Sequence, residues 1–321
     1  MLPTLRRCLR ASLFSLCLPL TALAQNPDVT TLVVPAAAGG GADILARLLA
    51  QKLGPLLDTS VVVDNRPGAN SAIGIAAVTR AKPDGTTLLL ADRTTTIVNP
   101  LRLSKLPYDP AGLIPVTDVA QLDFLFVAGV AAPFSTWQEM LAYAKANPGK
   151  VSVGSSGVGS GAHLSLELLA REAGASFVHV PYKGMSPALQ DVMGGVIDGL
   201  IAGPAVVMPQ LDSGKIRLLA QGASQRSPQF PDTPTVAELG ITKTILLPVT
   251  FTVFAPQGTP PATVARLQEA LHQATRDPDT VQRFASMALT PLANTPAEVA
   301  SDSARLSQQL DIVIRDVGLR E

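Results

Sequence analysis

The chain has 321 residues, with 25 basic and 25 acidic side chains, three histidines and two cysteines. This balance excludes the strongly basic surface that nucleic acids attract, so we expect no nucleic-acid partner. A chain of this length can form two domains that each bury a core of their own.

Residues 1–24 have the pattern of a secretory signal peptide. Basic residues open the segment, an apolar run extends to Leu20, and Ala22-Leu23-Ala24 fits the small-x-small cleavage pattern. We therefore expect export to the periplasm and a mature chain that begins at Gln25. Both cysteines would leave with the leader, so the mature protein would have neither a disulfide nor a thiol nucleophile.

The first half of the mature chain alternates between strand and helix patterns. Apolar strand patterns at 31–35, 60–64 and 86–91 flank a helical repeat at 42–53 and a shorter helix at 72–81. Such a switch between periods 2 and 3.6 is typical of βαβ units, and we expect an α/β fold with mostly parallel sheets.

A second set of strands and helices begins after Asp123. Strand patterns at 124–130 and 176–184 enclose helices at 136–146 and 161–170, and the chain turns helical after the strand at 248–256. Helix starts are marked by Thr259-Pro260, Asp277-Pro278 and Thr295-Pro296, where a capping oxygen precedes a proline.

Two glycine-rich loops each join a strand to a helix: a first glycine loop at 35–41 and a second glycine loop at 155–160. Such loops expose backbone N–H groups beside the positive end of a helix dipole, which is an anion site. The second loop fits a dinucleotide spacing, but the acidic residue expected after the next strand is missing. The pair predicts a cleft for a small anion, although glycines also simply allow close packing.

Catalytic motifs are missing from the sequence. It contains no H-E-x-x-H or Cys/His cluster, no P-loop lysine motif and no G-x-S-x-G elbow. We therefore expect no enzyme activity, no metal and no cofactor. His179 lies in an apolar strand and is expected in the core, whereas His163 lies in the first turn of a helix and could face the cleft.

Several segments resemble the Bug/TctC family, the solute-binding receptors of tripartite tricarboxylate transporters. They include "VVVDNRPGANSAIG", "VSVGSSGVGSGAHLSLELL", "VPYKG" and "PDTPT", and they occur in the family's order along the mature chain. The resemblance implies a two-lobed type II periplasmic-binding-protein fold that closes like a Venus flytrap. Lobe I would comprise 25–123 plus 249–321, and lobe II would comprise 124–248.

The resemblance also implies which residues hold the ligand, a small organic carboxylate bound by loop backbone and water. The predicted ligand-binding residues that match the family are Pro35, Ala37, Ala38, Gly39, Gly40, Ser155, Ser156, Gly157, Gly159, Ser160, Tyr182, Lys183 and Gly184. We add His163 because it lies in the first turn of its helix, and Arg93, Thr94 and Gly203 because they lie in two stretches that border the cleft in the family but depart from its pattern in this chain.

Three stretches depart from the family pattern. The first glycine loop lacks the usual aromatic residue, 92–95 is charged where the family has a small polar loop, and 202–204 lacks a polar pair. Arg93 has two interpretations: it forms a bidentate fork for the ligand carboxylate, or it pairs with Asp92 or points to solvent.

The expected function is that of a monomeric periplasmic receptor that delivers a small carboxylate to membrane permease subunits. An alternative is a sensory protein of the same fold that signals to a membrane kinase, and sequence does not separate the two. A secreted hydrolase that uses serines of the second glycine loop is a third, more distant hypothesis.

Overall fold

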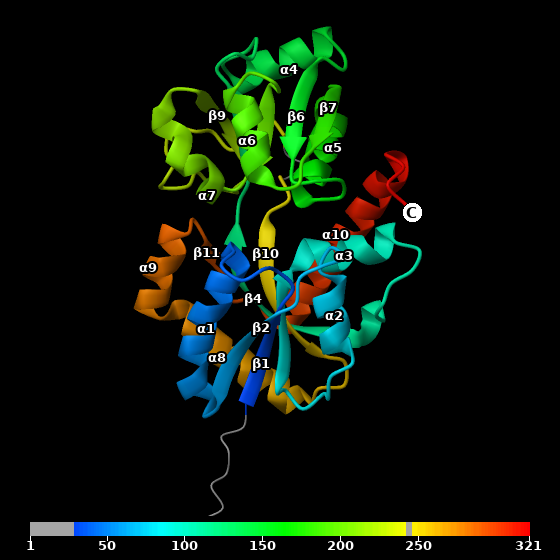
Figure 1. Cartoon of the computed structure of the whole chain (residues 1–321), viewed down its shortest axis with the longest axis vertical. Helices are drawn as coiled ribbons and strands as arrows, with labels where there is room; N and C mark the ends of the chain where they lie inside the picture. Colours follow the sequence, from blue (N-terminus) through cyan, green and yellow to red (C-terminus); the bar gives the residue numbers. More distant parts are fainter. Residues whose placement is uncertain (1–28, 242–245) are drawn as a thin grey trace, which may run out of the picture.

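The computed structural model describes residues 29–241 and 246–321, and these form two α/β lobes stacked along the long axis of the molecule (Figure 1). Lobe I contains a six-stranded sheet of order β11-β4-β10-β3-β1-β2, and lobe II contains a five-stranded sheet of order β7-β6-β8-β5-β9. The strands are β1 (Val29–Val34), β2 (Ser60–Asn65), β3 (Thr87–Asp92), β4 (Leu113–Leu122), β5 (Leu125–Gly129), β6 (Val151–Ser155), β7 (Phe177–Pro181), β8 (Gly199–Ala202), β9 (Ile216–Gln221), β10 (Val249–Pro256) and β11 (Thr290–Pro291).

Helices cover the sheets and bury their apolar faces against them. Leu45, Leu49 and Leu53 of α1 are buried with strand residues such as Leu32 and Leu90 in the largest core cluster of lobe I. The helices are α1 (Gly41–Leu57), α2 (Ala72–Thr79), α3 (Arg93–Arg102), α4 (Trp137–Ala146), α5 (Gly161–Ala173), α6 (Met185–Met193), α7 (Pro204–Val207), α8 (Pro261–Arg276), α9 (Pro278–Ser286) and α10 (Pro296–Asp316), with 3-10 turns η1 (Pro110–Gly112) and η2 (Met208–Ser213).

The expectation of mostly parallel sheets is confirmed in part: most strands of each sheet run in one direction, but five of the nine strand pairings among the described residues are antiparallel. Strands β1, β2 and β3 of lobe I are parallel, as are β6, β7 and β8 of lobe II. The pairings of β10 with β3 and β4, of β11 with β4, and of β5 with β8 and β9 are antiparallel. Strands β5 and β10 each enter their sheet from the other lobe, and they therefore run against the strands on either side of them. The short strand β11 follows α9 and pairs with the outer edge of β4.

Helix boundaries follow the capping chemistry of the sequence with two exceptions. Asp277 caps α9, and Thr295 with Glu298 forms the capping box of α10. Helix α8 begins one residue later than expected, because Pro260 rather than Thr259 is its N-cap. The stretch expected as a loop at 92–95 opens helix α3, since Asp92 accepts the Thr94 N–H at 3.0 Å and acts as the N-cap.

The last helix joins the two lobes. Leu310, Val313 and Ile314 of α10 form one apolar cluster with Val98 of α3 and Leu164 of α5. Figure 1 shows the C-terminal end of α10 reaching the level of α5, which is a helix of lobe II. The contact ties lobe I to lobe II on this side of the molecule.

The predicted signal peptide and its cleavage site lie outside the described residues. Within 29–241 and 246–321, no helix combines the length and apolar character needed to cross a bilayer.

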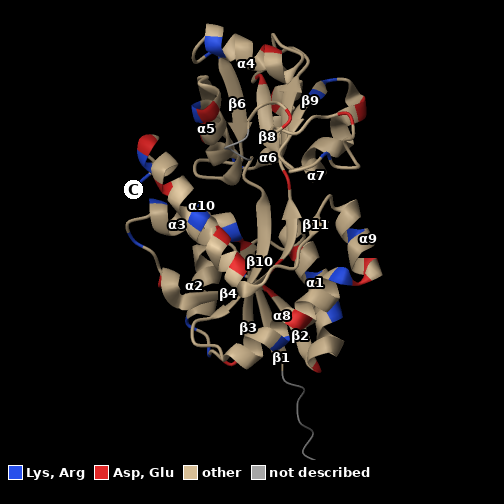
Figure 2. Ribbon diagram, turned by 180° about the vertical axis from the view of Figure 1, so that it is seen from behind, with Lys and Arg blue, Asp and Glu red and all other residues tan. Residues whose placement is uncertain are grey.

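Figure 2 shows basic and acidic segments interspersed along α10 rather than separated into blocks of one sign.

Candidate ligand-binding site

The two glycine loops lie at the carboxyl ends of β1 and β6, and both strands run toward the opposite lobe (Figure 1). In an open α/β sheet this end of the strands is where ligands bind. The fold therefore directs both loops to the region between the lobes.

The first glycine loop is anchored by a buried carboxylate. The Gly39 N–H donates to Oδ2 of Asp43 at 2.8 Å, and the same oxygen accepts from Nε of Arg47 at 2.9 Å. The Arg47 guanidinium and then the Gly39 N–H lower the pKa of the Asp43 carboxyl to about 2. Nδ2 of Asn65 also donates to the Ala36 carbonyl at 3.1 Å, so this loop is fixed from beneath.

Asp43 changes what the first glycine loop offers to a ligand. Its carboxylate lies in the first turn of α1, where a negative charge interacts favourably with the helix dipole. Part of the attraction that this helix end has for an anion is therefore already satisfied within the protein. Pro35 is partly buried, and Ala37, Ala38, Gly39 and Gly40 are exposed.

The second glycine loop differs, because no acidic residue lies in the first turn of α5. Ser160 is the N-cap, and its Oγ accepts the His163 N–H at 3.3 Å. Gly157 and Gly159 have φ of +132° and +77°, a region that favours glycine. Their N–H groups are directed inward: Gly157 donates to Oγ of Ser155 at 3.1 Å, and Gly159 donates to Nδ1 of His163 at 3.0 Å.

Two histidines are stacked beneath this loop. The imidazole rings of His163 and His179 have centroids 3.7 Å apart and planes 13° apart. Nε2 of His179 lies 2.6 Å from Oγ of Ser155, and burial followed by the His163 ring lowers the pKa of His179 to about 4. The expectation that His179 is a core residue is therefore wrong: it is only partly buried, since it lies on an edge strand and borders the loop.

Residues after β7 support the second glycine loop from the side. The Tyr182 N–H donates to the Ser155 carbonyl at 3.0 Å, and the Tyr182 hydroxyl donates to Oδ2 of Asp191 at 2.6 Å. Burial and the Asp191 carboxylate raise the pKa of Tyr182 to about 12. Lys183 is exposed, and Gly184 has φ of +111° as the N-cap of α6.

Arg93 points to a buried acid within lobe I. Its Nη1 lies 3.4 Å from Oδ2 of Asp118, and the two side chains are 12% and 2% exposed. Burial raises the pKa of Asp118 despite the nearby guanidinium. The interpretation that Arg93 pairs with Asp92 or points to solvent is wrong, since Asp92 instead caps α3 and the Arg93 side chain is mostly buried. The bidentate contact with a ligand carboxylate stays a prediction. Thr94 is itself buried, so both predicted residues at the start of α3 are enclosed.

Gly203 lies at the passage between lobes. A Cβ atom there would come within 2.8 Å of Cδ2 of Leu122, the last residue of β4. A larger residue at this position would therefore require the Leu122 side chain to shift.

Arg102 contacts the second glycine loop, and the sequence did not predict this contact. It ends α3 in lobe I, and its Nη1 donates to the Val158 carbonyl of the second glycine loop at 3.3 Å. Its guanidinium also pairs with the side chain of Glu321, whose backbone N–H donates to the Arg102 carbonyl at 2.8 Å. The contact joins the lobes beside the loop, over a sequence separation too large for local patterns to reveal.

A cavity of about 620 Å³ lies between the lobes on the side of α9. Oδ1 of Asp123 accepts from Nε2 of Gln121 at 2.7 Å, and burial raises the pKa of this carboxyl. Nε2 of Gln229 in lobe II donates to the Ala285 carbonyl of α9 at 2.7 Å across the cavity's edge. Within the described residues, the lining includes Pro204 but none of the predicted ligand-binding residues.

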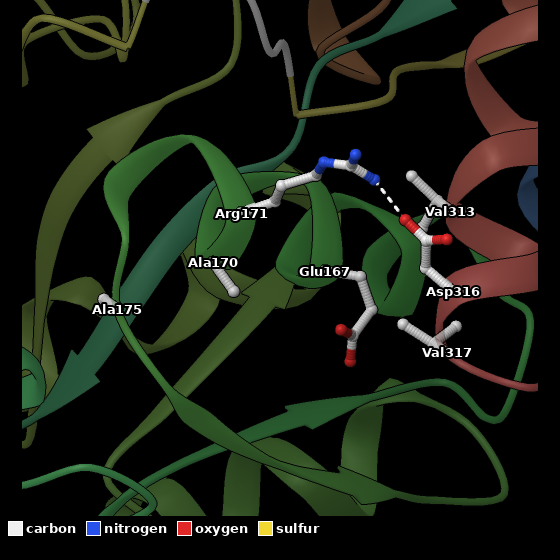
Figure 3. A pocket seen from close by; sticks show the side chains of 7 residues that line it. All are labelled: Glu167, Ala170, Arg171, Ala175, Val313, Asp316 and Val317. Atoms are coloured by element: carbon white, nitrogen blue, oxygen red, sulfur yellow. Dashed lines mark hydrogen bonds and ion pairs between the residues drawn. The ribbon is translucent and has the colours of Figure 1, made fainter.

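A smaller groove of about 340 Å³ separates α5 from the end of α10. Figure 3 shows Arg171 of α5 reaching across it to Asp316, with Nη1 and Oδ2 2.5 Å apart, while Glu167 extends into the groove. The ion pair adds a polar link to the apolar contact between the lobes. No cluster of three or more potential metal ligands occurs among residues 29–241 and 246–321.

Comparisons of the sequence with a family model and with curated proteins indicate the same family. Residues 45–319 match the model of the tripartite tricarboxylate transporter family receptor, TctC. The chain is 35% identical to Protein BugT of Bordetella pertussis over 291 residues, which cover 90% of this chain and 89% of that protein.

Solved structures agree with this match. Rpa4515 of R. palustris with adipate has a TM-score of 0.77 at 30% identity, covering 91% of this chain and 98% of that one. MatC (Rpa3494) from Rhodopseudomonas palustris with bound malate has a TM-score of 0.73 at 28% identity, covering 90% and 99%.

The fold is thus the two-lobed α/β fold of periplasmic binding proteins, as expected from the sequence. The matched family consists of solute receptors for transport and not of enzymes, which confirms that expectation as well. The chain belongs to the TctC family of tripartite tricarboxylate transporter receptors, the Bug proteins.

Proposed function

We propose that this protein is a periplasmic receptor that binds a small organic carboxylate between its lobes and delivers it to the membrane permease of a tripartite tricarboxylate transporter. The observation that carries the proposal is the second glycine loop, which opens α5 without an acidic residue in its first turn. Structures of relatives with adipate and with malate support a carboxylate as the ligand class.

The chemistry of this helix end suits a carboxylate. The first N–H groups of a helix have no acceptor within it, and here they belong to Gly161 and Ala162. They combine with the positive end of the helix dipole to attract an anion. Ser156 is exposed at the loop's edge and supplies a hydroxyl. We assign the charged end of the ligand to lobe II, since Asp43 occupies the equivalent position in lobe I.

The remaining assignments follow the same proposal. Residues 25–123 and 249–321 form lobe I, 124–248 form lobe II, and the exposed Ala37–Gly40 segment faces the ligand's other end. Residues 1–24 direct export to the periplasm and are removed there. The mature protein acts as a monomer. Intact-mass measurement of exported protein should give a chain that starts at Gln25, and retention of 1–24 would contradict the export assignment.

A thermal-shift screen of the mature protein tests the ligand class. The panel consists of adipate, malate and related di- and tricarboxylates, each with its neutral amide or alcohol analogue. A ligand at 100 times its Kd stabilises the folded state by about 2.7 kcal/mol. Stabilisation by carboxylates and not by their analogues is the expected result, whereas stabilisation by the analogues alone would refute the proposal.

Calorimetry with the best carboxylate then tests the loop. Ser156→Ala should weaken binding by about 0.5–1.5 kcal/mol if its hydroxyl donates to the ligand. Ser176→Ala is the matched control, since Ser176 is also exposed but lies before β7, at the strand end opposite the loop. Equal effects of the two substitutions would place the ligand elsewhere.

A further inference from the structure

The second glycine loop owes its shape to an imidazole nitrogen. Gly159 at φ +77° donates its N–H to Nδ1 of His163 at 3.0 Å, and this ring is 4% exposed. The His163 N–H in turn donates to Oγ of Ser160 at 3.3 Å. One histidine therefore links both sides of the loop's last turn.

The hydrogen bond from Gly159 specifies the protonation state of this ring. A nitrogen that accepts an N–H carries no proton of its own, so the single ring proton of a neutral His163 lies on Nε2. Nε2 lies 3.5 Å from Oε1 of Glu167, one turn along α5, which suits an N–H at that position. Protonation of Nδ1 would place two hydrogens against each other and break the bond to Gly159.

The surroundings of the ring contain charges of both signs. His179 lies against one face, with centroids 3.7 Å apart, and a second protonated imidazole at that distance is repelled. Arg102 of α3 approaches from lobe I, with Nη1 2.7 Å from where a Cβ of Gly159 would lie. The Glu167 carboxylate favours a proton on the Nε2 side of the His163 ring. Glu167 also borders the groove that holds the Arg171–Asp316 ion pair (Figure 3).

We infer that His163 is a positioning residue of the ligand site: its unprotonated Nδ1 holds Gly159, and with it the second glycine loop, in the geometry that accepts the ligand. A proton on Nδ1 would break this bond and release the loop, so conditions that protonate the ring should weaken binding. Burial, followed by the neighbouring His163 ring, lowers the pKa of His179 to about 4, so the folded protein disfavours a charge on that stacked imidazole. The consequence for affinity rests on the proposed function, whereas the loop geometry does not.

The first experiment needs no ligand. The chain has three histidines, so ¹⁵N NMR of the imidazoles can be assigned with single variants. We expect His163 as the Nε2–H tautomer at pH 7.5, with a Gly159 amide protected from hydrogen exchange that loses protection in His163→Phe. A proton on Nδ1 of His163 at pH 7.5, or an unprotected Gly159 amide in the parent, would overturn the inference.

The second experiment measures affinity with the carboxylate from the thermal-shift screen, between pH 7.5 and 4.5. His163→Phe keeps a flat ring without an acceptor and should bind about three- to tenfold more weakly, the range for one hydrogen bond. His163→Asn places Oδ1 where Nδ1 lies, so it should recover most of that loss. The asparagine side chain of His163→Asn does not titrate. We therefore expect the parent protein to lose affinity relative to this variant as the pH falls.

The ratio of parent to variant Kd at each pH cancels the ligand's own titration. His272→Asn is the control, because His272 lies in lobe I with Nε2 3.0 Å from Oγ1 of Thr117. Parallel pH profiles for the parent and His163→Asn, or full affinity in a folded His163→Phe, would overturn the inference. If no carboxylate binds the parent, the proposed function fails while the NMR result still decides the role of His163.

Discussion

Gly159→Ala perturbs the second glycine loop at a position that is constrained both by a positive φ and by a neighbouring side chain. The residue has φ of +77°, and an alanine in the left-handed region costs about 1–2 kcal/mol. A Cβ atom would also come within 2.7 Å of Nη1 of Arg102. That side chain can move, but its bond to the Val158 carbonyl is lost, and an ordinary hydrogen bond contributes about 0.5–1.5 kcal/mol. We expect a total destabilisation of about 1.5–3.5 kcal/mol.

Gly174→Ala provides a matched control on the same helix. Gly174 caps the end of α5 with φ of +61°, and a Cβ there meets no atom within 4 Å. Both variants should therefore share the backbone strain, measured by urea unfolding, while only Gly159→Ala should weaken carboxylate binding in calorimetry, by about tenfold. Equal affinity of the two variants would refute the reasoning that the loop's backbone holds the ligand.

Three further predictions concern stability. Burial raises the pKa of Asp92 from 3.8 to about 6, so the folded state holds a proton that the unfolded state releases, and stability falls as the pH rises through this interval. Unfolding measured against Asp92→Asn should show the parent losing about 3 kcal/mol across it, and a constant difference would exclude the shift. Arg93→Ala leaves Asp118 without its charged partner, with the Thr252 hydroxyl still donating to it, and should destabilise by about 3–5 kcal/mol with unchanged ligand affinity. Weakened binding would instead assign Arg93 to the ligand site. Thr295→Ala removes one half of the capping box of α10 and should cost about 1 kcal/mol in thermal unfolding, with no loss expected only if the end of the helix is frayed.

The sequence alone determined the features that depend on neighbours along the chain. The helical repeats of α1 and α5, the two glycine loops before them and the caps of α9 and α10 are all local patterns, and the structure has them where they were expected. The order of family motifs also predicted the two-lobed fold. Local geometry and a recognisable motif order suffice for these features because neither depends on how distant segments pack.

Tertiary structure decided the partners of the site residues. His163 and His179 lie on a helix and on the next strand, and only the parallel pairing of β6 with β7 stacks their rings. Arg93 reaches Asp118 because β10 pairs with both β3 and β4 and brings the start of α3 close to β4. The antiparallel pairings of β5 and β10 likewise follow from the two passages between the lobes. Such contacts join segments far apart in the chain, where burial and hydrogen bonding, rather than local propensity, select the partner.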